Sequence, residues 1–403
     1  MDTQERLTPV TIRVLHLIDS GGLYGAERML LALVQEQLNE GLEPMILSAG
    51  EPAIGEKPLE AEARHLGLPV RPWRMRPGLN LHEAWRVLQW ARRHRYEVLH
   101  SHGYKFNILM GVWPRRLRRI PLMCTLHGYV QAPRWTKMAA YEIFDRFMLR
   151  RADRIVIVNE AMRGILPSAA TAPGRCVFIA NGIAPEPPAA RPWPEHLQEF
   201  VAGHRVNLIA VGRLSREKGF DRLIRALAGN RDTLADVGIV IVGEGGMHAE
   251  LEAMIDSTGL DDRIVLAGYQ PDAASLLPHF DGLVMPSLTE GLPITVLEAL
   301  RAEVPIIASA VGGLPAVLAT IPSAQLVPPA DDMALAEALR RLADNGVTRE
   351  ATKAGVAVFR RDYTSERMTA HYTALYKELG AGERREARES IPPRSEKPHH
   401  PRR

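Results

Sequence analysis

Short runs rich in Val, Ile and Leu alternate with amphipathic stretches of helical length along most of this 403-residue chain. Runs that are apolar throughout indicate strands covered on both faces, and their alternation with helices predicts parallel sheets built from right-handed crossovers. The strands expected in the first half are Thr11–Ile18, Pro44–Ser48, Glu97–His100, Leu122–Leu126, Arg154–Val158 and Cys176–Ala180. Those expected in the second half are Val206–Val211, Gly238–Val242, Ile264–Ala267, Gly282–Met285, Pro305–Ala308 and Gln325–Val327.

This rhythm predicts an α/β protein with two open, doubly wound domains of about six strands each. We place the first domain at residues 1–183 and the second at 205–362, with a proline-rich linker at 184–204 that contains APEPPAARPWPEH. Residues 363–379 have the spacing of an amphipathic helix, which could cross back to the first domain. Residues 380–403 are charged and nearly free of apolar side chains, so we expect a disordered tail.

The composition fits a globular protein, with 46% hydrophobic and 24% charged residues. No apolar run approaches the ~20 residues of a membrane-spanning helix, and the N-terminus lacks the features of a secretory signal. We therefore expect a cytoplasmic protein, possibly peripheral on the inner face of the membrane. The two cysteines, Cys124 and Cys176, lie in apolar segments, which excludes a disulfide framework or a cysteine-based metal site.

Charge is divided unevenly along the chain. Residues 1–200 hold 26 Lys and Arg against 20 Asp and Glu, whereas residues 201–380 hold 17 against 23. A basic first half suggests an anionic partner, either nucleic acid or an anionic membrane surface. Nucleic acid is not expected, because no recognition motif accompanies the basic clusters. The arginines next to Trp and Leu suit lipid headgroups, and an ordinary solvated helix face is the alternative. These arginines are Arg71, Arg74, Arg76, Arg92, Arg93, Arg95, Arg115, Arg116, Arg118 and Arg119.

Loops that follow parallel strands are where ligands bind in such folds, and two of them have the features of a phosphate site. The loop after the first strand contains Gly21 and Gly22, which allow backbone N–H groups to approach an anion at a helix N-terminus. A tight turn without a ligand explains these glycines equally well. The loop after Val211 carries Arg213 and Lys218 ahead of a helix at Asp221–Ala228, which suits a diphosphate. A solvated basic turn is the alternative.

Two further loops carry acidic and histidine side chains. Glu290 lies on the loop after Met285, and Glu298 lies about two turns into a helix whose first residue we take to be Pro293. Glu290 can then face a sugar while Glu298 accepts hydrogen bonds from ribose hydroxyls, unless Glu298 pairs with Arg301. His127 ends a strand at the expected crevice, where it suits a sugar hydroxyl or a phosphate. A structural role is the alternative for His127, as it is for His100 and His102.

These loops, in this order, resemble the retaining glycosyltransferases of family four, which have the GT-B architecture of two Rossmann-like domains facing across a cleft. The resemblance covers roughly residues 10–379. It implies that Arg213 and Lys218 hold the donor diphosphate, and that Glu290 and Glu298 are the ends of the family's E-x7-E motif. It also implies that His127 is the active-site histidine, so that His127, Arg213, Lys218 and Glu290 form the catalytic set.

Glycine turns extend the resemblance. Gly243-Glu244-Gly245 resembles the family's G-x-G turn, and Asn181-Gly182 its N-G turn. The chain departs from the family in having Ala184 where the usual aspartate stands, and in lengthening the first glycine loop to GGLYGAE. The implied donor-binding residues are Gly21, Gly22, Gly212, Gly243, Gly245, Gly291, Leu292 and Glu298.

The resemblance predicts transfer of a sugar, with retention, from a UDP- or GDP-linked donor to a saccharide or lipid-linked acceptor, in cell-surface polysaccharide or glycolipid biosynthesis. The sequence contains no D-x-D triplet, so we expect no metal and no other cofactor. Two alternatives remain open at this point: a nucleotide-sugar epimerase of the same architecture, and a binding protein without turnover.

Overall fold

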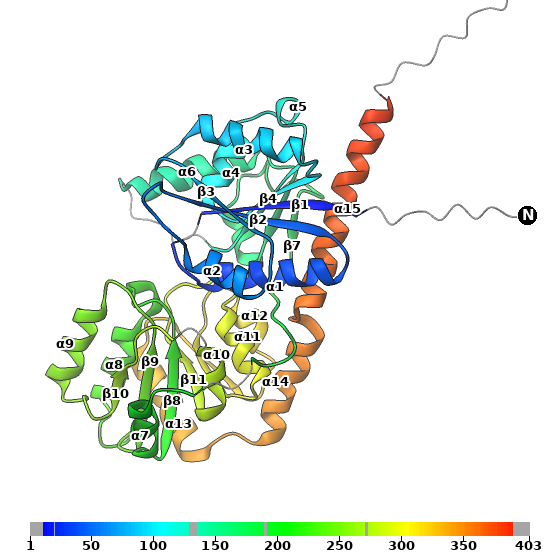
Figure 1. Ribbon diagram of the computed structural model, residues 1–403. Helices are drawn as coiled ribbons and strands as arrows, with labels where there is room; N and C mark the ends of the chain where they lie inside the picture. Colours follow the sequence, from blue (N-terminus) through cyan, green and yellow to red (C-terminus); the bar gives the residue numbers. More distant parts are fainter. Residues whose placement is uncertain (1–10, 20, 129–134, 189–191, 271–272, 390–403) are drawn as a thin grey trace, which may run out of the picture.

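The computed structural model describes residues 11–19, 21–128, 135–188, 192–270 and 273–389. It consists of two α/β lobes, with α14 lying on the second lobe and the long helix α15 continuing from it along the first (Figure 1). Each lobe is a parallel sheet between layers of helices. The prediction of two doubly wound α/β domains is therefore confirmed.

The sheet of the first lobe has seven strands in the order β3-β2-β1-β4-β5-β6-β7. The order reverses between β1 and β4, which pair in parallel with Val14 opposite Val98. The strands are β1 Arg13–Ile18, β2 Glu43–Gly50, β3 Val70–Arg74, β4 Val98–Ser101, β5 Leu122–Leu126, β6 Arg154–Ile157 and β7 Cys176–Phe178. Strands β4 and β5 are buried along their whole length, and β1 is buried at every position after Arg13, because helices cover both faces of the sheet.

The sheet of the second lobe has six parallel strands in the order β10-β9-β8-β11-β12-β13, and it reverses between β8 and β11. The strands are β8 Val206–Val211, β9 Val237–Val242, β10 Ile264–Leu266, β11 Gly282–Met285, β12 Ile306–Ser309 and β13 Ala324–Val327. In both lobes the reversal point opens a crevice at the carboxyl ends of the strands, where ligands bind in open α/β sheets.

Helices connect the strands in both lobes. Those of the first lobe are α1 Gly25–Asn39, α2 Pro58–His65, α3 Leu81–Arg93, α4 Tyr104–Gly111, α5 Arg115–Arg118 and α6 Lys137–Leu149. Those that follow are α7 Glu195–Ala202, α8 Phe220–Ala228, α9 His248–Thr258, α10 Ala273–Leu276, α11 Ile294–Arg301, α12 Leu314–Leu318, α13 Asp332–Asn345, α14 Arg349–Asp362 and α15 Ser365–Glu389. Three short 3-10 turns lie at Glu160–Ile165, Arg216–Lys218 and Leu277–His279.

The structure differs from the sequence expectations at three segments. Strand β3 was missed because VRPWR contains a proline and two arginines, which an edge strand tolerates. Part of the expected linker, residues 195–202, is helix α7, which starts after Pro194 and buries Leu197 completely. Residues 380–389 of the expected tail continue α15, and this segment is rich in Ala, Glu and Arg, which favour a helix. Residues 390–403 lie outside the described residues.

Helix α15 packs against the first lobe, although it follows the second lobe in the chain. The side chains of Tyr372 and Tyr376 are fully buried there. The Tyr376 hydroxyl lies 2.7 Å from His100 Nδ1 and accepts a 3.2 Å hydrogen bond from the Gln37 amide, and the Tyr372 hydroxyl lies 3.0 Å from Thr125 Oγ1. The last helix therefore joins the two lobes.

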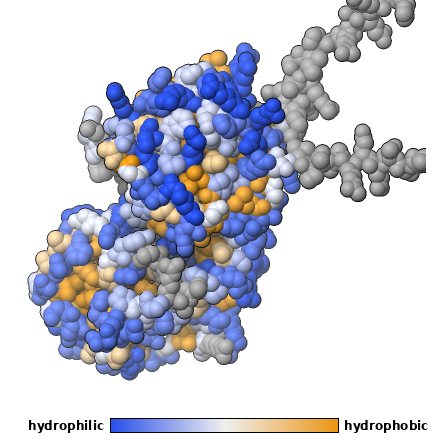
Figure 2. Space-filling model, viewed as in Figure 1, coloured by the Kyte–Doolittle hydropathy of each residue, from blue (hydrophilic) through white to orange (hydrophobic). Residues whose placement is uncertain are grey.

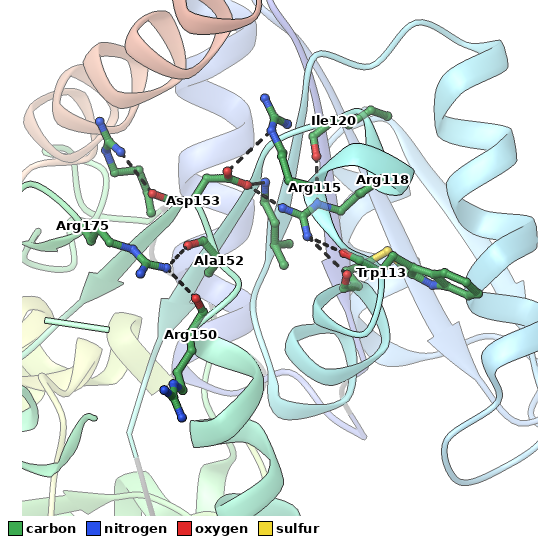
Figure 3. Close-up of polar contacts among 11 residues, drawn as sticks. Trp113, Arg115, Arg118, Ile120, Arg150, Ala152, Asp153 and Arg175 are labelled. Atoms are coloured by element: carbon green, nitrogen blue, oxygen red, sulfur yellow. Dashed lines mark hydrogen bonds and ion pairs between the residues drawn. The ribbon is translucent and has the colours of Figure 1, made fainter. Parts of the chain in front are cut away.

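One arginine of the basic clusters is a core residue. Arg118 is completely buried and donates hydrogen bonds to the Ile120 carbonyl at 2.9 Å and the Trp113 carbonyl at 3.1 Å (Figure 3). Its other terminal nitrogen pairs with Asp153 at 2.5 Å. The expectation that Arg118 belongs to a lipid-facing surface is wrong: the side chain is buried, and each of its three nitrogens has a hydrogen-bond partner that offsets the cost of burial. The visible face of the first lobe is nonetheless mostly hydrophilic (Figure 2).

We expect Tyr376→Ala to lower the free energy of unfolding by about 3 to 5 kcal/mol, because it opens a cavity and removes the partner of His100 Nδ1 and of the Gln37 amide nitrogen. Tyr376→Phe removes only the hydroxyl and should cost about 1 to 3 kcal/mol. Lys377→Ala, on the exposed face of the same helix, is the matched control. Urea denaturation measures all three, and equal stability of the Ala variant and the control would contradict the role given to α15.

Candidate active site

A cavity of about 860 Å³ lies between the lobes, at the carboxyl ends of both sheets. The first lobe lines it with the loops after β1, β4, β5 and β6, and the second lobe with those after β8, β9 and β11. The predicted site residues on its wall are Gly21, Gly22, His127, Gly212, Arg213, Lys218, Gly243, Glu290, Gly291, Leu292 and Glu298. Gly245 is not part of the wall. The structure thus brings together residues that are up to 277 positions apart in sequence, from Gly21 to Glu298.

The cationic loop after β8 is tied to the acidic loop after β11. The Lys218 ammonium lies 2.6 Å from Glu290 Oε1, which also accepts a 2.7 Å hydrogen bond from the Ser287 hydroxyl. An ammonium has three N–H donors, so Lys218 retains two for a ligand. Both Glu290 contacts use one oxygen, so Oε2 has no hydrogen-bond partner among the described residues. The loop after β11 therefore presents a carboxylate oxygen and the neighbouring loop presents N–H donors to the same cavity.

Glu298 lies about one turn into α11, because the helix begins at Ile294 and Pro293 precedes it as the N-cap. The sequence analysis placed Pro293 one position too far into the helix. One terminal nitrogen of Arg301, the residue considered as a partner for Glu298, donates to the carbonyls of Ala184 at 2.8 Å and Glu186 at 3.1 Å. The E-x7-E pair thus spans the start of α11, with both carboxylates on the cavity wall.

The G-x-G turn after β9 lies directly against the loop after β8. A Cβ on Gly243, whose φ is +146°, would lie 1.9 Å from the Gly212 carbonyl oxygen, and one on Gly245 would lie 2.3 Å from that of Leu214. These glycines therefore let two backbone segments touch. Gly291 performs a similar function between the lobes, because a Cβ there would lie 2.5 Å from the carbonyl oxygen of His127.

His127 is the end of a row of hydrogen-bonded histidines inside the first lobe. Its Nε2 lies 3.4 Å from His102 Nδ1, His102 Nε2 lies 3.0 Å from His16 Nδ1, and His16 Nε2 lies 2.8 Å from Gln37 Oε1. The sequence analysis missed His16 and Gln37. The available signal was His16 itself, a polar residue within the apolar run RVLHLI.

The Gln37 amide sets the direction of every bond in this row. Its nitrogen donates to Tyr376, so its oxygen accepts from His16 Nε2–H. His16 Nδ1 then accepts from His102, and His102 Nδ1 accepts from His127 Nε2–H. Burial lowers the pKa of His127 and of His16 from 6.5 to about 4, although the hydrogen bond to Gln37 opposes this for His16. His127 is accordingly a neutral ring with a fixed tautomer.

His16, His100 and His102 also have the spacing of a metal-binding cluster, since one ring nitrogen of each lies within 4.8 Å of the others. Their nitrogens are already engaged. His16 and His102 bond to each other and to Gln37 and His127, and His100 lies 2.7 Å from both the Tyr376 hydroxyl and Thr125 Oγ1. Ligation would break these bonds, so the donor set fits a hydrogen-bond network better than an ion.

We expect the rings of His16 and His127 to stay neutral as the pH falls to about 4, observed by NMR of histidine-labelled protein and assigned with His16→Asn and His127→Asn. The same rings bind protons near pH 6.5 in the unfolded chain. The native state therefore loses stability as the pH falls from 6.5 towards 4, and it has its full stability above pH 6.5. The loss should be about 2 kcal/mol per ring between pH 7 and pH 5. Titration of either ring near pH 6.5 would contradict this assignment.

Comparisons with known proteins agree with this geometry. Residues 24–187 match the model for Glycosyltransferase Family 4, and residues 196–356 match the model for Glycosyl transferases group 1. The chain is 26% identical over 341 residues to the 2-deoxystreptamine glucosyltransferase of Streptomyces kanamyceticus, covering 76% of this chain and 86% of that protein. It is 28% identical over 233 residues to the UDP-Gal:alpha-D-GlcNAc-diphosphoundecaprenol alpha-1,3-galactosyltransferase of Escherichia coli, covering 55% and 60%.

Among solved structures, Anabaena HepE in complex with UDP-glucose superposes with a TM-score of 0.77 at 19% identity, over 91% of this chain and 100% of that one. This likeness concerns the fold, which is that of the GT-B glycosyltransferases. The two family models together span both lobes and most of the cavity wall. The chain therefore belongs to the group 1 and family 4 glycosyltransferases and is a glycosyltransferase of GT-B architecture.

Proposed function

We propose that the enzyme transfers a hexosyl group from a UDP- or GDP-linked sugar, with retention, to a saccharide or lipid-linked acceptor. The observation that carries the proposal is that two cationic side chains, Arg213 and Lys218, lie together on the cavity wall, in the loop just before α8. Two relatives support a uridine nucleotide, since the HepE complex contains UDP-glucose and the Escherichia coli enzyme is named for UDP-Gal.

The proposed chemistry places the cations where negative charge develops. As the bond between the anomeric carbon and the diphosphate oxygen breaks, Arg213, Lys218 and the N-terminus of α8 stabilise the leaving diphosphate. The oxygen of the acceptor hydroxyl forms the new bond to the anomeric carbon, and its proton passes to the leaving diphosphate. Glu290 Oε2 accepts from a hydroxyl of the donor sugar, Glu298 accepts from the ribose, and neutral His127 bonds to the sugar. Metal-independent transfer is part of the proposal, because side-chain cations supply the charge that a metal would otherwise provide.

A membrane-associated acceptor is supported by the outer face of α6. Ile143 and Phe147, four residues apart, are 67% and 51% exposed, and the exposed Arg150 guanidinium lies 5.6 Å from the Phe147 ring centre. The other side of α6 is held in place by Asp145, which accepts a 2.9 Å hydrogen bond from Asn107. Apolar side chains flanked by cations suit the surface of an anionic bilayer. Among the helices described, none is long and apolar enough to cross a bilayer.

We therefore place the enzyme peripherally, on the inner face of the membrane, where nucleotide sugars and lipid-linked acceptors meet. A role in cell-surface polysaccharide or glycolipid biosynthesis follows from such an acceptor. The diphosphoundecaprenol substrate in the name of the Escherichia coli relative supports this placement.

We expect Lys218→Ala to lower transfer at least about a hundredfold, because the leaving diphosphate loses a cation. Transfer is assayed with radiolabelled UDP- and GDP-sugars in the presence of EDTA, in which the wild type should stay active. Arg216→Ala is the matched control, because Arg216 lies in the same loop, is exposed and is not part of the cavity wall. Melting temperatures are recorded for both, since Glu290 loses its partner in the first variant. Full activity of a folded Lys218→Ala would refute the diphosphate assignment.

We expect the wild type to co-sediment at low salt with vesicles that contain phosphatidylglycerol and not with phosphatidylcholine alone. The double variant Ile143→Asp/Phe147→Asp should bind at least about tenfold more weakly, because two apolar side chains no longer enter the bilayer. Met333→Asp, which alters an exposed apolar side chain of the second lobe, is the matched control. If the wild type stays in the supernatant, or if the double variant still sediments, the proposal that α6 binds the membrane is wrong.

A further inference from the structure

Tyr24 connects the lengthened glycine loop of the first lobe to the cationic loop of the second. It lies within GGLYGAE, the segment that departs from the family pattern, and its side chain lines the cavity. The guanidinium carbon of Arg213 lies 4.5 Å from the centre of the Tyr24 ring. This distance is typical of a cation-π interaction, and it joins two residues from facing lobes.

Three contacts position Tyr24, one of them made by its ring. The backbone N–H of Tyr24 donates a 2.8 Å hydrogen bond to Glu27 Oε2 in the first turn of α1. The ring lies over Gly22, where an added Cβ would come within 2.5 Å of a ring carbon. The next residue, Gly25, faces the Ile294 side chain of α11 across the lobe boundary. The lengthened loop thus places an aromatic ring against Arg213.

Stacking leaves the hydrogen-bonding capacity of Arg213 intact. An aromatic ring covers the flat face of a guanidinium, whereas its five N–H donors point outward in the plane. Among the described residues, none accepts a hydrogen bond from the Arg213 guanidinium, while Lys218 is bound to Glu290. The Arg213 donors are therefore available for phosphate oxygens, while the ring restricts where the guanidinium plane lies.

We propose that Tyr24 is a positioning residue of the donor site, which holds the Arg213 guanidinium plane from the opposite lobe so that its N–H edge meets the donor diphosphate. This inference rests on the proposed function. It explains the lengthened loop, because a compact glycine loop has no side chain at this place. It also means that the first lobe contributes to binding of the diphosphate, through Arg213 and without touching it.

The test compares Tyr24→Leu, Tyr24→Phe and Arg213→Gln with the double variant Tyr24→Leu/Arg213→Gln. Dissociation constants for UDP and GDP are measured by calorimetry, and kcat and donor KM are measured for whichever nucleotide sugar the wild type uses. Phe178→Leu, an exposed aromatic substitution of the first lobe outside the cavity, is the matched control. Melting temperatures check the fold of each variant.

Tyr24→Leu should weaken nucleoside diphosphate binding by about 3- to 30-fold, and Tyr24→Phe should restore it to within about twofold, because phenylalanine keeps the ring face. In the Arg213→Gln background, Tyr24→Leu should have no further effect, since the residue through which Tyr24 acts is gone. Additive effects, unchanged binding or tighter binding in Tyr24→Leu would each overturn the inference. A wild type that binds neither UDP nor GDP would instead refute the proposed function.

Discussion

The packing of α15 against the first lobe is the constraint on which the arrangement of the two sheets depends. The helix follows α14, which packs on α11 of the second lobe, yet it buries Tyr372 and Tyr376 beside β4 and β5. A buried hydroxyl needs a partner, and here the partners are His100, Gln37 and Thr125. Because these bonds require one position of the helix, they hold the carboxyl ends of the two sheets opposite each other, and the cavity is the space that results.

The two lobes provide polar groups of different kinds. The first lobe buries neutral imidazoles, whose pKa values are lowered by burial, and it orders them through Gln37 and Tyr376. In more exposed loops, the second lobe provides the ion pair of Lys218 and Glu290 and the Arg213 guanidinium, which has no acidic partner among the described residues. A neutral hydrogen-bonding surface suits hydroxyl groups and a cationic one suits phosphates, so the division of charge matches the two ends of a nucleotide sugar.

The sequence allowed the prediction of most strands because a strand covered on both faces is apolar at nearly every position, as Leu122–Leu126 and Val206–Val211 show with one polar residue each. It did not allow the prediction of β3, because this edge strand contains a proline and two arginines and is not an apolar run. Loop residues such as Arg213, Lys218 and Glu290 were located because their spacing is local. The histidine row escaped prediction because His16 and His102 are 86 positions apart, and charge alone could not distinguish buried Arg118 from its exposed neighbours.

The contact between Gly291 and the backbone of His127 has a consequence for how the enzyme tolerates change. Gly291 lacks a Cβ atom, and this lets the loop that carries Glu290 approach the backbone of His127. Any larger residue at position 291 would push the two lobes apart at this point. One added methyl group at position 291 would displace the neighbouring Glu290 relative to His127 without altering any polar group. The distance between Glu290 and His127 thus depends on the lack of a side chain at position 291, and any substitution there would increase it.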